Sequence, residues 1–524
     1  MKIKYIAFLL PLLLTGCTMI FGEEQLVPQE YQQVYMQPRV EETSNIPQQG
    51  GMINISMRNP LTLNPILNRD ITVDRVLSLL YESLEDMVSE IEIAEDYTFA
   101  ILTLKNAKWE DGEPITARDV TFTIETIRNN PDSLYTEAIS NIAGFSAVDD
   151  NHVLLTFATP KPGRVEESFV FPIIPAHFFA NNLRQRNMET LASGPFKMDT
   201  DILPREMTLR NNPQSFKSVY LDKINVIITP DLQTDVHALN QGTIDVLSNN
   251  SGLLELGLSS VGFNVKSYET NNIDFIAFNF DNPIIRDVRI RQAILYSAIP
   301  DDIISNVYLG QGVRASSVVH TSSENYREGL NYFKYDTAHA IGLFSLAGFS
   351  YIGEDTLGTV VAGIPVPMNL RILVNEENEE RVQVARLLRH NLEAMGISIE
   401  YMEVDFETYL QQVNARNFDI IFGGVNINPY WDLRFLLGTG GSQNVMNYQS
   451  AHLDMLLNRV INAPDTESFR NAMLEMQDYT NEEVPLYVIA FRHGTLLVSG
   501  EVGGEIAPSQ NNIFRDIENW FIRR

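Results

Sequence analysis

The chain has a single cysteine among 524 residues, so no disulfide bond can form within it and the fold depends on the burial of a core. Basic residues are also scarce, because 38 Lys and Arg stand against 67 Asp and Glu, a formal net charge of −29 at pH 7. Such a charge repels nucleic acids and anionic lipid surfaces, so we expect neither as a partner. No apolar stretch reaches the roughly 20 residues that cross a bilayer.

The sequence also lacks the common motifs of enzymes and metal sites. It contains no Gly-Lys-Ser/Thr phosphate loop, no His-Glu-x-x-His zinc helix and no Gly-x-Ser-x-Gly nucleophile elbow. The eight histidines are scattered, and none lies three or four residues from another histidine or from the cysteine. We therefore expect no cofactor, no metal site and no enzymatic activity. A pair of glycosidase-type carboxylates is the open alternative, because the sequence does not show which acids lie close together.

The cysteine lies at the end of the most informative segment. Two lysines precede an apolar stretch over residues 5–14, and two small or compact residues, Thr15 and Gly16, then precede Cys17. This order is typical of a secretory leader. The segment resembles a bacterial lipoprotein leader, which implies removal of residues 1–16 and lipid modification of Cys17; a plain secretory leader with a chance cysteine is the alternative. We expect a protein held by its lipid at the extracytoplasmic face of the cell membrane, with 17–50 as a flexible tether.

The globular part, from about residue 51, contains a clear strand and helix alternation. Apolar residues alternate or recur at helical spacing in five successive segments, 368–374, 382–395, 397–401, 406–413 and 418–422. The order strand, helix, strand, helix, strand predicts an α/β fold with a parallel sheet and right-handed crossovers. Ligands of such open sheets bind beyond the carboxyl ends of the strands, so the loop predicted over Gly423–Asp432 is a candidate binding site.

A series of short blocks resembles one known family. The blocks occur in the expected order at 106–120, 172–177, 193–196, 209–213, 221–224, 242–246, 278–279, 287–294 and 483–486. They resemble the extracellular solute-binding proteins of ABC importers, in the peptide/nickel-type group (solute-binding protein family 5), which includes oligopeptide-binding lipoproteins. The likeness runs from about residue 50 to the C-terminus.

The resemblance implies a fold and a domain order. The fold is periplasmic-binding-protein-like: two α/β lobes with a ligand cleft between them, and an extra smaller α+β domain. Carried onto this sequence, lobe I comprises 51–74, 176–270 and 486–524. The extra domain covers 75–175, and lobe II covers 271–485. Because the chain crosses several times between the lobes, a hinge that lets them close on a ligand is physically plausible.

The resemblance also implies contact segments for the ligand. In peptide binders of this family, extended backbone pairs with the ligand as an added strand. The first such segment corresponds to Arg58-Asn59-Pro60, in which Pro60 has no N–H to donate. Arg58 either meets a carboxylate or is a solvated or structural arginine. Asn279, at the end of an apolar strand near the lobe boundary, is either a ligand contact or a buried amide.

The second contact segment is the loop after residue 421. Peptide binders of the family place an acid there, shortly before a proline, to receive the α-amino group of the ligand. Here no acid precedes the proline, and Asp432 is the nearest replacement. Asn426 and Asn428 can donate and accept hydrogen bonds, or they form turns. Tyr430 and Trp431 can stack on an apolar or sugar-like face, or they pack in the core.

These features together predict a membrane-tethered, monomeric solute-binding protein. We expect it to capture a small solute, an oligopeptide by resemblance, between closing lobes and to deliver it to the permease subunits of an ABC importer. A receptor of the same fold for peptide pheromones and a surface hydrolase are the alternatives. The altered loop before Asp432 leaves the identity of the solute open.

Overall fold

The computed structural model describes residues 45–160, 164–183, 188–199, 206–249, 262–298, 300–427 and 431–524. Cys17, most of the predicted tether, Asn428 and Tyr430 lie outside the described residues. The tether's described end is bound to the folded part, because the Gln49 side chain donates to a backbone carbonyl at 219 and the Gly50 N–H to another at 220. Among the described helices, none has both the length and the apolar character needed to span a membrane.

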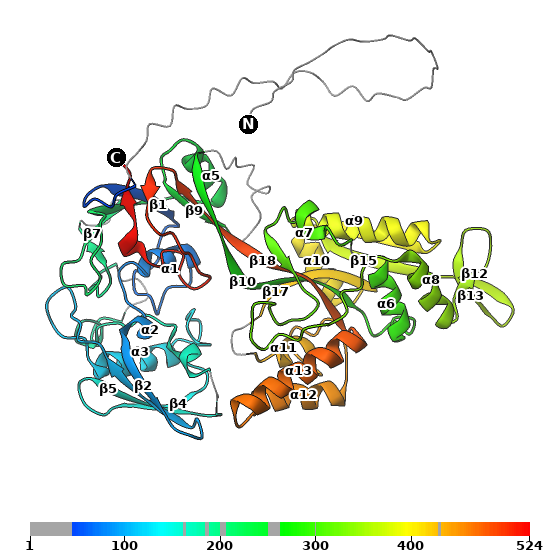
Figure 1. The fold of residues 1–524 in the computed structure, drawn as a ribbon, viewed down its shortest axis with the longest axis horizontal. Helices are drawn as coiled ribbons and strands as arrows, with labels where there is room; N and C mark the ends of the chain where they lie inside the picture. The colour runs from blue at the N-terminus through cyan, green and yellow to red at the C-terminus, as the bar shows by residue number, and fades with distance from the viewer. Residues whose placement is uncertain are drawn as a thin grey trace, which may run out of the picture. The chain divides into compact units, whose positions relative to one another are not determined.

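The main sheet contains strands from the beginning, the middle and the end of the chain (Figure 1). Its order is β16-β15-β17-β10-β18-β9-β1-β8-β7-β6, with β11 beside β18. The strands are β1 (Met52–Met57), β6 (Phe196–Met198), β7 (Glu206–Asn211), β8 (Lys223–Ile228), β9 (Val246–Asn249), β10 (Phe263–Phe278), β11 (Gly312–Arg314), β15 (Asn369–Asn375), β16 (Ser398–Val404), β17 (Ile420–Asn426) and β18 (Leu486–Ser499).

One half of this sheet is built around β1. Its alternate residues are buried, as a strand with one face on a core requires, and β8 and β9 pair with it in parallel. Helices α1 (Ile71–Leu77) and α5 (Leu232–Asn240) follow β1 and β8, and Asp70 and Asp231 cap their N-termini through side-chain oxygens. This arrangement brings the carboxyl ends of β1 and β9 together beside both helices.

The other half confirms the predicted alternation over 368–424. Strands β15, β16 and β17 are parallel, and α9 (Glu379–Ala394) and α10 (Phe406–Asn414) connect them. Adjacent residues of β15 belong to different hydrophobic clusters: Ile372 packs in a cluster with α6 (Val288–Tyr296), α8 (Thr337–Leu346) and α9, and Leu373 in one with α12 (Ala451–Ile461) and α13 (Thr466–Glu483). The strands are thus buried on both faces, as is usual for parallel sheets.

The predicted loop Gly423–Asp432 is partly wrong, because β17 continues as far as Asn426. Residues Asn272–Phe278 of β10 pair antiparallel with the whole of β17. This pairing supplies ladder hydrogen bonds to Gly423 and Gly424, and it overrides the weak strand propensity of glycine.

The long strands β10 and β18 connect the two halves of the sheet (Figure 1). The first part of β10, Phe263–Glu269, pairs with the end of β18, which also pairs with β9. The last part of β10 pairs with β17 and with the beginning of β18. A register shift between Glu269 and Ile273 separates these two parts. Such an irregularity bends a strand locally, so it is a natural place for a change of angle between the halves.

A second, antiparallel sheet has the order β2-β3-β5-β4. Its strands are β2 (Val88–Ile93), β3 (Phe99–Leu104), β4 (Ile142–Ala147) and β5 (His152–Phe157), and α3 (Ala117–Arg128) packs on it. A capping box of Thr116 and Asp119 begins α3. Buried residues of this sheet and of β1 form one hydrophobic cluster, so the two sheets share a core. The domain boundaries expected from the sequence stay predictions.

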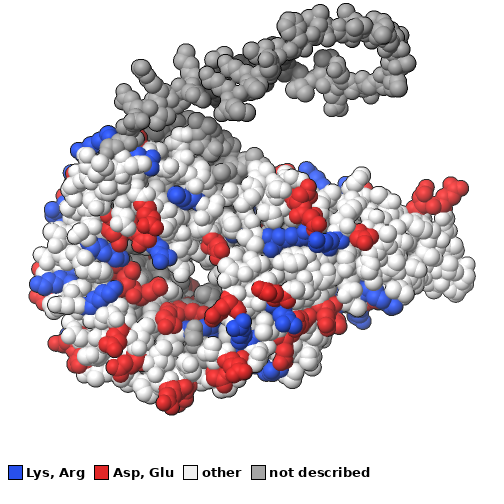
Figure 2. Space-filling view, in the orientation of Figure 1, with Lys and Arg blue, Asp and Glu red and all other residues white. Residues whose placement is uncertain are grey.

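The remaining described elements are short. They are α2 (Leu84–Met87), α4 (Ala176–Phe179), α7 (Ile303–Asn306), α11 (Arg434–Leu437), the small sheet of β12 (Ser350–Tyr351), β13 (Leu357–Val361) and β14 (Ile364–Pro367), and the pair β19 (Val502–Gly503) and β20 (Phe521–Ile522). Acidic side chains are spread over the face shown in Figure 2, interspersed with Lys and Arg.

Candidate ligand-binding site

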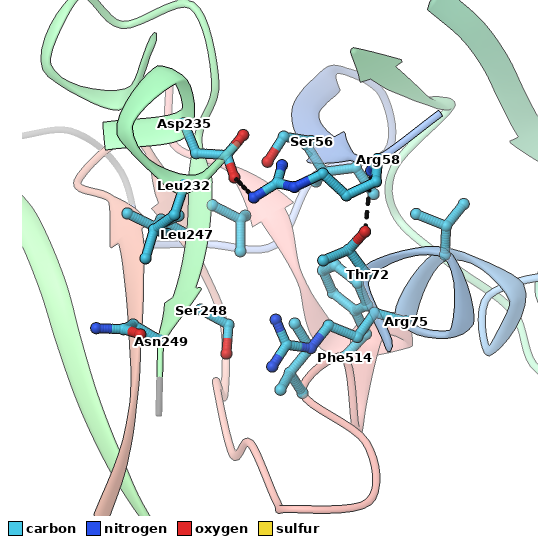
Figure 3. Close-up of a pocket in the computed structure, with 14 residues that line it drawn as sticks. Ser56, Arg58, Thr72, Arg75, Leu232, Asp235, Leu247, Ser248, Asn249 and Phe514 are labelled. Carbon is cyan, nitrogen blue, oxygen red and sulfur yellow. Dashed lines mark hydrogen bonds and ion pairs between the residues drawn. The ribbon is translucent and has the colours of Figure 1, made fainter. Parts of the chain in front are cut away.

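A cavity of about 240 Å³ lies at the carboxyl ends of β1 and β9 (Figure 3). Residues of β1, α1, α5, β9 and the segment 513–514 line it. Its polar lining residues are Ser56, Arg58, Thr72, Arg75, Asp235, Ser248 and Asn249, and its apolar ones are Ile55, Val76, Leu232, Val246, Leu247, Ile513 and Phe514. Open sheets of this type bind ligands at the carboxyl ends of their parallel strands, and ligand pockets usually combine polar and apolar lining residues.

Arg58, which was predicted as a ligand contact, lines this cavity. Its Nη2 lies 2.8 Å from Oδ2 of Asp235, and its Nη1 donates to Oγ1 of Thr229 at 2.7 Å. Thr229 in turn donates to the other carboxylate oxygen of Asp235 at 2.6 Å. The backbone N–H of Arg58 donates to the hydroxyl of Thr72, in the first turn of α1. Arg58 is therefore held in the wall by these contacts; Asn59, its neighbour, is exposed.

A second arginine of the cavity, Arg75, was not predicted from the sequence. It is half-buried in the last turn of α1. In Figure 3 its guanidinium points into the space on the Ser248 side, whereas Arg58 is turned toward Asp235. Burial lowers the pKa of Arg75 from its ordinary value. The local signal was weak, because one arginine within a short apolar helix resembles any solvated residue.

The acids near α1 are engaged elsewhere. Asp70 accepts the N–H groups of Thr72 and Val73 as the helix cap. Asp74 accepts a hydrogen bond from the hydroxyl of Tyr135 at 2.7 Å, and burial raises its pKa to about 6. Neither acid lines the cavity.

The carboxyl ends of β15 and β17 form a second polar edge, in the half of the sheet that carries the predicted loop. Asp274 of β10 is fully buried, and it accepts hydrogen bonds from Nε of Arg381 at 2.7 Å and from the hydroxyl of Tyr308 at 3.0 Å. Arg492 of β18 lies 3.8 Å from the same carboxylate and 3.1 Å from Glu380. Two arginines and two acids thus form a buried network beside the end of β17.

Gly424 allows this network to reach the strand end. A Cβ at this position would overlap the guanidinium of Arg381. Two residues further along, the exposed Asn426 donates from its side-chain amide to Oδ1 of Asn272 at 2.9 Å. Asn426, a predicted ligand residue, therefore lies at the carboxyl end of β17, as the topology predicts for a binding site.

The other described residues of the predicted loop are engaged with the protein. Trp431 has a left-handed backbone with φ 57° and packs, half-buried, against the core cluster around α12 and α13. Both carboxylate oxygens of Asp432 face the guanidinium of Arg434, at 2.8 and 2.7 Å.

Asn279 lies at the other end of β17. It is buried, and its amide donates to the backbone carbonyls of Arg416 at 3.1 Å and Phe418 at 2.8 Å, while its Oδ1 accepts the N–H of Asp281 at 3.0 Å. The strand β17 between it and Asn426 is about 20 Å long at ~3.3 Å per residue. The structure does not bring Asn279 together with the other predicted residues, and its contact with a ligand stays a prediction.

Comparison with known proteins decides the family. Residues 82–447 match the family model for bacterial extracellular solute-binding proteins, family 5. The chain belongs to this family. The family resemblance and the two-lobed periplasmic-binding-protein-like fold expected from the sequence are thereby confirmed. The family consists of binding proteins of importers rather than of enzymes, and its members act outside the cytoplasm.

Relatives of this solute-binding protein share most of its length at low identity. The oligopeptide-binding protein AppA of Bacillus subtilis is 21% identical over 513 residues, which cover 91% of this chain and 93% of the relative. The ABC transporter substrate-binding protein CtaP of Listeria monocytogenes superposes with a TM-score of 0.75 at 21% identity, over 91% of this chain and all of that one. NikZ of Campylobacter jejuni, solved with Ni(L-His), has a TM-score of 0.68 at 19% identity, over 90% of this chain and 99% of that one.

Proposed function

We propose that this solute-binding protein captures an oligopeptide outside the cytoplasm and delivers it to the permease subunits of an ABC importer. The cavity at the carboxyl ends of β1 and β9 carries the proposal, because it combines polar groups with apolar walls in the position where this sheet type binds ligands. The similarity to an oligopeptide-binding protein over nine-tenths of the chain supports a peptide as the solute.

The capture itself uses the strand pair β10 and β18. The register shift between Glu269 and Ile273 lies where the two halves of the sheet join. Bending at this shift would let the polar edge around Arg381 and Asn426 approach a solute in the cavity. The solute is held and released without a chemical change, and Asn428, Tyr430 and Trp431 remain proposed contacts of the loop.

Mass spectrometry tests the solute assignment directly. Protein purified from its native host is denatured, and the released small molecules are identified and then added back to ligand-free protein. A genuine solute present at 100 times its Kd should raise the free energy of unfolding by about 2.7 kcal/mol. Recovery of peptides that produce this shift supports the proposal. Failure of a broad peptide library to bind, together with binding of another class of solute, refutes it.

The size of the cavity and the sequence of the loop both favour a second solute class. At about 240 Å³ the cavity lies below the usual 300–1,000 Å³ of small-molecule pockets, and no acid is present before the proline of the loop to receive a peptide N-terminus. NikZ, of the same fold, was solved with the small complex Ni(L-His). Metal chelates of amino acids therefore belong in the same binding screen. Uptake and pheromone sensing are separated by following labelled solute in a strain that lacks the importer.

The predicted lipid on Cys17 and the monomeric state have tests of their own. Metabolic labelling with a palmitate analogue should mark the wild-type protein, and Cys17→Ser should abolish the label and release the protein from the membrane. A labelled C17S variant would refute the lipid site. Light scattering of the detergent-solubilised protein should give the mass of one chain.

A further inference from the structure

The two arginines of the cavity differ in their partners. The positive charge of Arg58 is neutralised by Asp235, at 2.8 Å. Arg75 makes no ion pair or side-chain hydrogen bond with any residue that the structure describes. The cavity therefore carries one guanidinium without a direct partner, and Figure 3 shows that this guanidinium points into the cavity rather than along its wall.

The groups around Arg75 do not replace a partner. Asp70 and Asp74, on its own segment, are occupied by the helix cap and by Tyr135. The hydroxyl of Tyr268 lies 3.2 Å from that of Ser248, and the two share one hydrogen bond. The side of the cavity toward Arg75 thus offers a guanidinium that can donate to an anion.

A half-buried guanidinium without a direct anionic partner has lost part of its hydration, and the nearby charges of Asp70 and Asp74 offset this loss only in part. Burial lowers the pKa of Arg75 for this reason, although an arginine stays protonated at any physiological pH. The chain as a whole carries a charge of −29 and repels anions. A local, desolvated cation is the means by which such a protein can still bind an anionic group, and the planar fork of arginine matches a carboxylate in two hydrogen bonds.

We propose that Arg75 binds a carboxylate of the solute within the cavity. The volume of about 240 Å³ suits one amino-acid residue or one small organic acid rather than a whole peptide. The carboxylate is a chain terminus or an acidic side chain. This assignment rests on the solute-binding function proposed above and names the chemical class of the solute.

The test compares acidic probes with their neutral counterparts by titration calorimetry on the full chain in detergent. The pairs are a peptide with a free C-terminus and its C-terminal amide, the same amidated peptide containing Glu or Gln, and free L-glutamate or citrate with L-glutamine. The variants are Arg75→Gln, Arg75→Lys and the matched control Arg69→Gln. Arg69 lies on the same segment, is largely exposed, and pairs with Asp132 outside the cavity.

We expect Arg75→Gln to weaken binding of the acidic probe about ten- to a hundredfold, the range of a charged hydrogen-bonded contact, and to leave the neutral probe unchanged. Arg75→Lys should recover part of the loss, and Arg69→Gln should bind like wild type. The pair of probes whose affinities differ shows where the carboxylate comes from. A loss of affinity on amidation of the C-terminus indicates a chain terminus, and a loss of affinity on the change from Glu to Gln indicates a side chain. Equal unfolding midpoints show that the variants are folded.

Two results would overturn the assignment. The first is that wild type and Arg75→Gln show the same ratio of affinities for acidic and neutral probes. The second is that the solute recovered from the native host has no acidic group. The peptide function fails separately. If glutamate or citrate binds in an Arg75-dependent way and no peptide binds, the carboxylate site stands and the peptide proposal falls. If peptides bind, but the acidic and the neutral member of every pair bind equally well in both proteins, the peptide proposal stands and the carboxylate site falls.

Discussion

Replacing Asn279 by alanine should destabilise the protein without changing its affinity for the solute. The side chain is 2% exposed, and it makes three hydrogen bonds with backbone groups: two carbonyls of the segment 416–418 and one N–H of its own turn. These contacts fix the chain between β10 and β17, which are neighbours in the main sheet. They lie at the end of β17 opposite the polar edge around Asn426.

The magnitude follows from the number of groups left without a partner. A buried hydrogen bond contributes about 1 kcal/mol, and a buried polar group left unsatisfied costs about 1–3 kcal/mol. Three lost bonds therefore predict a decrease of about 3 kcal/mol in the free energy of unfolding. In Asn279→Asp the introduced carboxylate faces two carbonyl oxygens. Its pKa in the folded state should be raised, so the destabilisation should grow as the pH rises above about 4.

Urea unfolding followed by circular dichroism measures the stability, and calorimetry with the recovered solute measures affinity. Asn426→Ala is the control, because Asn426 is exposed and makes one side-chain hydrogen bond, so its loss should change stability by no more than about 0.5 kcal/mol. A stable Asn279→Ala variant, within 0.5 kcal/mol of wild type, that has lost solute binding would show that Asn279 contacts the solute and that the reasoning from its amide contacts is wrong.

Two further predictions concern buried charge. Gly424→Ala should displace Arg381 from its buried carboxylate partner and lower the unfolding free energy by about 3 kcal/mol, the cost of breaking a buried ion pair. The control is Gly342→Ala in α8, where a Cβ meets nothing within 4 Å, and this variant should be neutral or slightly stabilising. Equal urea midpoints for the two variants would contradict this prediction. Asp74 has a folded-state pKa of about 6 against an ordinary 3.8, so its protonated form favours folding. The protonated side chain therefore contributes about 3 kcal/mol to the free energy of unfolding at low pH, and this contribution should disappear as the pH rises from about 4 to above 6. Asp74→Asn, which keeps an acceptor for Tyr135, should therefore gain stability relative to wild type between pH 4.5 and 7.5, and a difference that stays constant over this range would refute the raised pKa.

The local elements were predictable because their causes lie within a few residues. The apolar spacing over 368–422 predicted three strands and two helices, since buried parallel strands and amphipathic helices each leave a distinct period in the sequence. Asp405 and Asp465 cap α10 and α13 in the position that aspartate favours, and each accepts an N–H three residues ahead. The family blocks also predicted the two-lobed fold, because many short motifs in a fixed order carry information that no single motif has.

The site was less predictable, because its contacts join distant parts of the chain. Arg58 was selected by resemblance, but its partner Asp235 lies 177 residues away and is brought to it only by the parallel pairing of β1 with β8. The register of β10 beside β17 decided that Gly424 belongs to a strand. No local signal distinguishes Arg75, whose direction depends on how α1 packs against β1.

The sequence by itself determined the fold class, the acidic surface and the family of this protein. These properties depend on composition, on periods of two and 3.6 residues, and on short motifs read along the chain. Only the tertiary structure decided which arginine is neutralised and which is left to face the cavity. That choice depends on distances between residues far apart in sequence, and the pairing order of the strands sets those distances.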